Sequence, residues 1–65
     1  MERSHTFELW QEIENTAVAF EKAKKFALRH YQKPLRIVLE KHPVLCVDYK
    51  EEDSWRYNFI IIEED

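Results

Sequence analysis

The fold of this chain is decided by residues 31–39, YQKPLRIVL, because the spacing of its hydrophobic residues changes within this stretch. Before Lys33-Pro34, apolar residues recur every three or four positions, which indicates a helix. After it they alternate, which indicates strands. Pro34 marks the boundary, since proline lacks a backbone donor and disfavours helical geometry at the preceding residue. The sequence therefore predicts a helix followed by a sheet.

The helix is expected to run from Thr6 to Lys33, a stretch without proline or glycine. Ser4 or Thr6 would cap its start, and basic residues gather near its end, where they complement the helix dipole. One apolar stripe follows the helical period along this stretch. Its members are Leu9, Ile13, Phe20, Ala23, Ala27 and Tyr31, with Thr16 as an interruption.

An alternative order, β-α-β-β-β, makes residues 6–13 a strand and lets Asn15 or Thr16 cap a shorter helix. We prefer the long helix because Glu, Leu, Gln and Ile are ordinary helix residues and no turn signal separates the two halves. The apolar face of the shorter helix would be Ala19, Phe20, Ala23, Phe26, Ala27 and Tyr31.

Three alternating segments follow the proline and predict a three-stranded antiparallel meander, with turns near residues 41–43 and 50–54. The helix would pack on this sheet to give one two-layer α+β domain of order α-β-β-β over residues 1–65. In the register that aligns the apolar residues, Asp48 lies between Arg36 and Arg56 on the outer face. The apolar pairs of that register are Leu39–Leu45, Ile37–Val47, Leu35–Tyr49, Tyr49–Trp55, Val47–Tyr57 and Leu45–Phe59.

The composition excludes several classes of function. The chain has no glycine, so it has no glycine-rich phosphate loop. Cys46 is its only cysteine, which rules out an internal disulfide and leaves no paired Cys/His spacing for zinc. No apolar run approaches the ~20 residues of a membrane span. We therefore expect a cytoplasmic protein that does not contact a membrane.

No group of residues carries recognisable catalytic chemistry. Cys46 has no activating neighbour in the sequence, and the three histidines are scattered. The acidic residues gather in a turn and at the C-terminus, where water would solvate them. We therefore expect no enzyme activity, no cofactor and no metal.

Association with a second copy is expected from geometry. A helix over residues 6–33 would be about 40 Å long, whereas the strands would span only about 20–27 Å, so the start of the helix would project. A chain of 65 residues also buries only about 60% of its unfolded surface and is marginal alone. The outer sheet face adds further apolar residues. The expected interface is Phe7, Leu9, Trp10, Ile13, Val38, Cys46 and Ile60.

These features predict a small non-catalytic interaction protein, a homodimeric regulator or inhibitor that binds another protein. The identity of that partner does not follow from the sequence. The alternative is a nucleic-acid-binding protein that uses the basic helix face Lys22, Lys25, Arg29 and Lys33. We rank this alternative second because the net charge is −3 and acidic residues lie beside the row.

Overall fold

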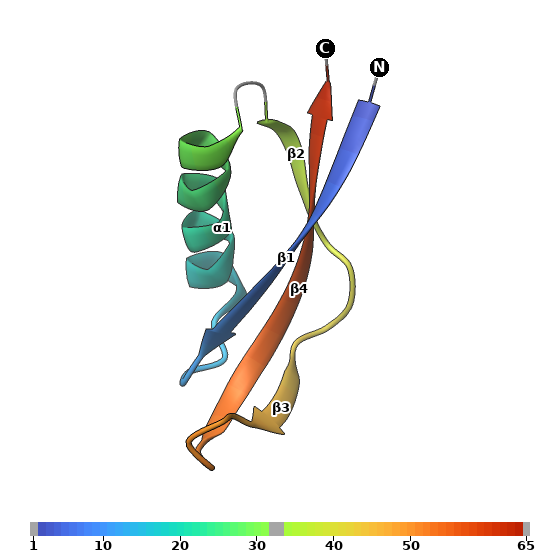
Figure 1. The fold of residues 1–65 in the computed structure, drawn as a ribbon. Coiled ribbons are helices and arrows are strands. Elements are labelled where there is room, and N and C mark those ends of the chain that lie inside the picture. Colours follow the sequence, from blue (N-terminus) through green and yellow to red (C-terminus); the bar gives the residue numbers. More distant parts are fainter. Residues whose placement is uncertain (1, 32–33, 65) are drawn as a thin grey trace.

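A computed structural model describes residues 2–31 and 34–64 as an α+β fold with one helix and a four-stranded antiparallel sheet (Figure 1). The helix lies against one face of the sheet, so the molecule has two layers. The elements in chain order are β1 (Glu2–Gln11), α1 (Thr16–His30), β2 (Pro34–Leu39), β3 (Val44–Val47) and β4 (Asp53–Glu64).

β4 is the central strand, and other strands pair with both of its sides. β1 pairs antiparallel with one side along its whole length, from Glu2 to Gln11. β2 and β3 pair antiparallel with the other side, one after the other. Between them the Glu40 backbone N–H donates to the Asn58 carbonyl at 2.8 Å, so the connecting chain stays beside β4. The sheet therefore has β1 at one edge and the β2–β3 pair at the other.

The N-terminal long helix expected over Thr6–Lys33 is wrong. The helix sits between β1 and β2, as in the alternative with a strand over residues 6–13. Asn15 marks its start, because the Asn15 side chain accepts a hydrogen bond from the Val18 backbone N–H at 3.1 Å. This cap satisfies one of the donors that a helix start leaves unpaired. Lys33, the expected last helical residue, lies outside the described residues.

The N-terminal segment is a strand because long-range pairing outweighs its local preference for helix. Phe7 and Leu9 pack against the core from the helix side of the sheet, while Thr6 and Glu8 are exposed on the other side. A strand also pairs its backbone with β4, which gives the segment both buried side chains and satisfied backbone groups. Intrinsic helix propensity is a weak preference by comparison.

The expected meander is wrong in its pairing, since β2 and β3 do not pair with each other in the part of the chain that the structure describes. Leu39 lies opposite Phe59, and Leu45 lies opposite Trp55. The sequence-based register instead places Leu45 opposite Phe59, four positions along β4. An even shift keeps every side chain on its own face of the sheet, so the alternation still sorts the inner from the outer residues.

The predicted place of Asp48 between Arg36 and Arg56 is also wrong. β4 has 12 residues, enough to accommodate β2 with 6 and β3 with 4 in line along one side. The chain after β3 therefore turns tightly, and Asp48 belongs to that turn. Its carboxylate accepts backbone hydrogen bonds from Lys50 at 2.8 Å and Glu52 at 3.0 Å. These two bonds replace the ion pairs expected from the sequence.

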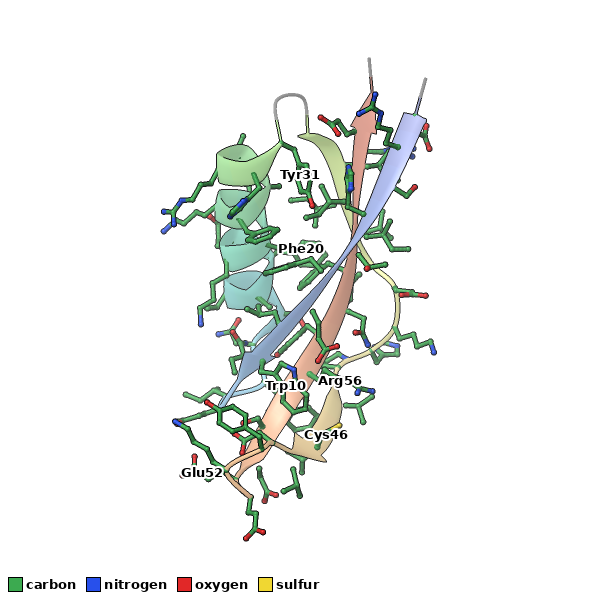
Figure 2. The ribbon with its side chains drawn as sticks, viewed as in Figure 1. Trp10, Phe20, Tyr31, Cys46, Glu52 and Arg56 are labelled. Atoms are coloured by element: carbon green, nitrogen blue, oxygen red, sulfur yellow. The ribbon has the colours of Figure 1, made fainter. Side chains whose placement is uncertain are left out.

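The core lies between small residues of α1 and large residues of β4. Figure 2 shows Phe20 projecting from α1 towards the sheet, where its ring meets that of Phe59 edge-on at 5.1 Å. Phe7 stacks on Phe26 of the helix at 4.1 Å. The small helix side chains let the aromatic residues of the sheet approach closely, as the sequence predicts. The fully buried apolar residues are Ala19, Ala23, Ala27, Tyr57, Phe59 and Ile61.

The sheet is longer than the helix that covers it, which reverses the expected geometry. The 15 residues of α1 span about 22 Å, whereas the 12 residues of β4 span about 40 Å. The molecule is accordingly elongated, 40 × 19 × 16 Å. Figure 1 shows β3 and the start of β4 extending beyond the N-terminal end of α1. The sheet therefore projects beyond the helix.

Candidate interaction surfaces

The projecting end of the sheet exposes apolar side chains on the face that α1 covers elsewhere. Leu45 is 52% exposed and Val47 is 63% exposed, and Leu45 lies opposite half-buried Trp55. Trp55 shares its face with buried Tyr57 and Phe59, so the whole group lies on the helix side. Tyr49, which is 90% exposed, follows in the turn. We call Leu45, Val47, Tyr49 and Trp55 the distal patch.

The seven predicted interface residues do not form one surface. Phe7 and Leu9 pack against the core, so their expected exposure on a projecting helix is wrong. Ile13 is 74% exposed in the loop between β1 and α1. The remaining four lie on the outer face of the sheet, opposite α1. The strand pairing aligns them with residues whose side chains point to that face. The four are Trp10, Val38, Cys46 and Ile60.

An arginine lies among the apolar residues of this outer face. Arg56 is opposite Trp10 in the register, and its guanidinium carbon lies 5.9 Å from the centre of the Trp10 ring. Figure 2 shows the two side chains next to each other. The indole nitrogen of Trp10 donates to the Glu8 carboxylate. The Arg56 Nε is buried and has no hydrogen-bond partner among the described residues.

The basic row of the helix follows α1, and three of its four members are described. Lys22, Lys25 and Arg29 are exposed, whereas Lys33 lies outside the described residues. Lys22 reaches towards β1, where its Nζ lies 3.3 Å from the Oε1 of Gln11. Lys22 therefore lies beside the β1 edge, whereas Lys25, about 200° around the helix from buried Ala23, faces away from the sheet. Sequence reasoning placed these residues on one helix face but not beside a sheet edge.

A buried tyrosine hydroxyl holds the loop that joins β1 to α1. The Tyr57 Oη accepts a hydrogen bond from the Asn15 backbone N–H at 2.7 Å and another from the Gln11 side-chain amide at 3.2 Å. The same amide donates to the Ile13 and Asn15 carbonyls at 2.9 and 3.0 Å. Sequence reasoning treated Tyr57 as a core residue only. A tyrosine that is predicted to be fully buried needs a hydrogen-bond partner for its hydroxyl, and this requirement is the sequence signal that could have pointed to the loop.

This anchored loop forms one wall of a shallow hollow. The hollow has a volume of about 380 Å³ and opens between the end of β1, the loop and the first turns of α1. Three apolar side chains, one cation, one carboxylate and two amides line it. They are Trp10, Ile13, Val18, Lys22, Glu12, Gln11 and Asn15.

The histidines stay apart, and one of them has a clear structural role. The Nε2 of His5 lies 3.2 Å from a Glu63 carboxylate oxygen across the β1–β4 pair, and its ring stacks on Tyr31 at 4.2 Å. The residues that the structure describes contain no group of three or more His, Cys, Asp or Glu side chains placed to hold a metal ion. Within the same residues, α1 is too short and too polar to cross a membrane.

The turn from β3 to β4 is built around Asp48. Besides its two backbone bonds, the carboxylate accepts a hydrogen bond from the Ser54 hydroxyl at 3.3 Å. Glu51 adopts a φ of 61°, the left-handed conformation that a tight turn requires in a chain without glycine. The bond from the Glu52 backbone, followed by those from Lys50 and Ser54, lowers the pKa of Asp48 from its ordinary value of 3.8.

Replacing Asp48 with Asn is expected to flatten the acid side of the stability curve. Because the pKa of Asp48 is lower in the folded chain, its ionised form stabilises the fold above pH 3.8. That contribution is lost as the pH falls through the folded-state pKa. Thermal unfolding midpoints recorded from neutral pH to below pH 3.8 should fall less steeply for Asp48→Asn than for the native chain. Glu12→Gln, an exposed change in another loop, should keep the native slope, and identical slopes for all three proteins would contradict the prediction.

These surfaces define the protein as a two-layer α+β fold whose single described helix leaves one end and the entire opposite face of a four-stranded sheet uncovered. Comparison with family models, with curated proteins and with solved structures finds no match. What the chain does must therefore be inferred from its own residues.

Proposed function

We propose that this chain is a small non-catalytic protein of the cytoplasm that regulates or inhibits by binding another protein, and that it does so as a homodimer. The observation that carries the proposal is the projection of the sheet beyond α1, which leaves the distal patch in water. The projecting helix predicted from the sequence is absent from the described residues, because Phe7 and Leu9 pack against the core from a strand. The projecting end of the sheet supplies exposed apolar side chains in its place.

The energetic case rests on the size of the exposed side chains. Burying one large aliphatic or aromatic side chain is worth about 1.5–3 kcal/mol. Leu45 and Val47 are both more than half exposed, and Trp55 is only half-buried. Small domains have a stability of only about 5–15 kcal/mol, so covering this patch is a large gain. None of the four residues of the patch carries a charge, so a charged partner surface is not required.

A second copy of the chain fits this surface better than another segment of the same chain does. The patch is apolar and therefore complementary to itself, as a two-fold interface requires. In such a dimer the projecting end of each sheet would lie over that of the other, beside the N-terminal ends of both helices. Each α1 would then help to cover the end of the partner's sheet that the partner's own helix leaves exposed. The outer sheet face and the β1 edge stay available for a further partner.

Sedimentation velocity over a range of concentrations tests the dimer. The native chain should sediment as a dimer, whereas Leu45→Ser with Val47→Ser should weaken association by about a hundredfold or more, given the apolar surface that both copies lose. The matched control is Leu28→Ser with Val44→Ser, because these residues are also exposed but lie on the helix and on the outer face. The control should remain a dimer.

Two outcomes would count against the proposal. A native chain that stays monomeric at high micromolar concentration would remove the dimer. A control pair that dissociates as readily as the patch pair would move the interface elsewhere. Circular dichroism on each variant verifies that the helix and the sheet are retained, so that a misfolded variant is not mistaken for a monomer.

A further inference from the structure

The two edges of the sheet differ in how open they are to another strand. β1 pairs with β4 through 10 consecutive residues that include no proline, and no strand of the described chain pairs with its other edge. The opposite edge is split between β2 and β3, is irregular between Pro34 and Arg36, and contains Pro43 in its gap. Proteins protect edge strands with such interruptions. β1 is therefore the edge whose backbone groups are free to accept a strand.

The helix places positive charge along this open edge. Ala23 is fully buried against the sheet, so its neighbours Lys22 and Lys24 lie about 100° to either side of it. Lys22 is on the β1 side, as its 3.3 Å contact with Gln11 shows. Arg29, two helical turns later, lies on the same side, and Lys24 lies on the side of β2. A strand added to β1 would run beneath Lys22 and Arg29.

The edge also offers apolar contacts. Phe26 projects on the β1 side of α1 and stacks on Phe7 at 4.1 Å, yet it remains partly exposed. At the end of β1, the hollow of about 380 Å³ is lined by Trp10, Val18 and Lys22. Glu12 also lines this hollow, so its apolar walls offer a place for an apolar side chain of a ligand and not for an acidic one. The surface thus combines a row of backbone donors and acceptors, a cationic flank and an apolar recess.

We infer that the β1 edge and the Lys22–Arg29 flank of α1 bind an extended acidic segment of a partner protein, which adds to the sheet beside β1. Strand addition supplies main-chain hydrogen bonds, and alternate side chains supply specificity. Acidic residues on the helix side of the segment would face Lys22 and Arg29. Apolar residues would meet Phe26 and the hollow.

Other occupants of this edge fit less well. A second copy paired through β1 would bring two Lys22–Arg29 flanks together across the two-fold axis, and like charges in apposition are costly. A nucleic-acid strand would satisfy the cations but leave the backbone groups of the edge unused. The inference rests on the proposed function only in that the ligand is a protein. Its surface is separate from the distal patch, so either can fail alone.

The geometry specifies the spacing of the acidic residues. Lys22 and Arg29 are about 10 Å apart along the helix axis, at about 1.5 Å per residue. Side chains on one face of a strand repeat about every 6.8 Å. Two acidic residues four positions apart on the helix side of the segment, about 13.6 Å, therefore reach Lys22 and Arg29, and the apolar residue between them on the same side meets Phe26.

A labelled peptide with Glu, Val and Glu on alternate positions, so that all three share one face of a strand, and with Ser on the positions between is the probe, and fluorescence anisotropy measures its binding. Lys22→Glu should weaken binding by about tenfold or more, because a like charge replaces an attraction. Lys24→Glu makes the same charge change on the opposite flank and should alter binding by less than about twofold. A peptide with Lys in place of Glu, and one with a central proline, should not bind.

Amide hydrogen exchange shows where the peptide lies. Strand addition should protect alternate β1 amides between Glu2 and Gln11 that exchange quickly in the free protein. No binding at millimolar peptide, equal weakening by Lys22→Glu and Lys24→Glu, or protection along β2 and β3 instead would each overturn the inference. Tighter binding of a single-stranded oligonucleotide, lost in Lys22→Glu, would assign the flank to nucleic acid. The dimer state of each variant, followed by sedimentation, reports separately on the distal patch.

Discussion

Replacing Phe59 with Ala is expected to lower the free energy of unfolding by about 3–5 kcal/mol, the typical cost of removing a buried aromatic ring. Phe59 is fully buried in the middle of β4. Its ring meets those of Phe20 at 5.1 Å, Tyr57 at 6.2 Å and Phe7 at 6.4 Å, so it joins the helix to two strands. The buried alanines of the helix opposite are too small to fill the space that the ring leaves, so a cavity would remain. The loss approaches the total stability of a small domain.

Urea unfolding at one fixed protein concentration measures this effect. Leu28→Ala is the control, because Leu28 is 64% exposed and its truncation should change stability by no more than about 0.5 kcal/mol. A variant that remains folded and loses less than about 1.5 kcal/mol would show that Phe59 is not the centre of the core. Phe59→Leu, which keeps most of the volume, should fall between the two.

Replacing Tyr57 with Phe is expected to cost about 1–3 kcal/mol, although it removes one oxygen atom and no apolar contact. The hydroxyl accepts the Asn15 backbone N–H at 2.7 Å, and that donor would lose its partner. The bond from the Gln11 amide would be lost as well. Since Asn15 caps α1, the start of the helix should loosen together with the loop.

Two measurements separate this effect from a general loss of packing. The Asn15 amide should exchange faster in Tyr57→Phe than in the native chain, whereas amides in the centre of β4 should change only with global stability. Tyr31→Phe is the matched control, because it removes the same oxygen atom from a ring outside the distal patch and leaves the stacking of that ring on His5 in place. Equal stability of the two variants would mean that water replaces the Tyr57 hydroxyl at no cost.

Part of the candidate site followed from local pattern, and part did not. Alternation predicted Val38 and Ile60 on the outer face of the sheet, where the register places them, and helical spacing grouped Lys22 with Arg29. Trp10 is predicted on a projecting helix, and it lies on the outer face because residues 2–11 form a strand. The pattern missed the distal patch, because Leu45 and Val47 have the same alternation as buried strand residues. Whether α1 reaches far enough to cover them depends on where the helix begins. The two predicted orders differ at this position, because the helix begins at Thr6 in α-β-β-β and near Asn15 or Thr16 in β-α-β-β-β.

By itself, the sequence determined the period change at Pro34, the alanine face of the helix and the two faces of the strands that follow Pro34. These are local properties, set by backbone geometry within a few residues. Only the tertiary structure decided that residues 2–11 form a strand, that β2 and β3 share one side of β4, and that Asp48 closes a turn. Each of these depends on pairing between segments far apart in the chain. Phe7 and Leu9 fit either a helix or a strand locally, and the contacts with β4 and α1 select the strand.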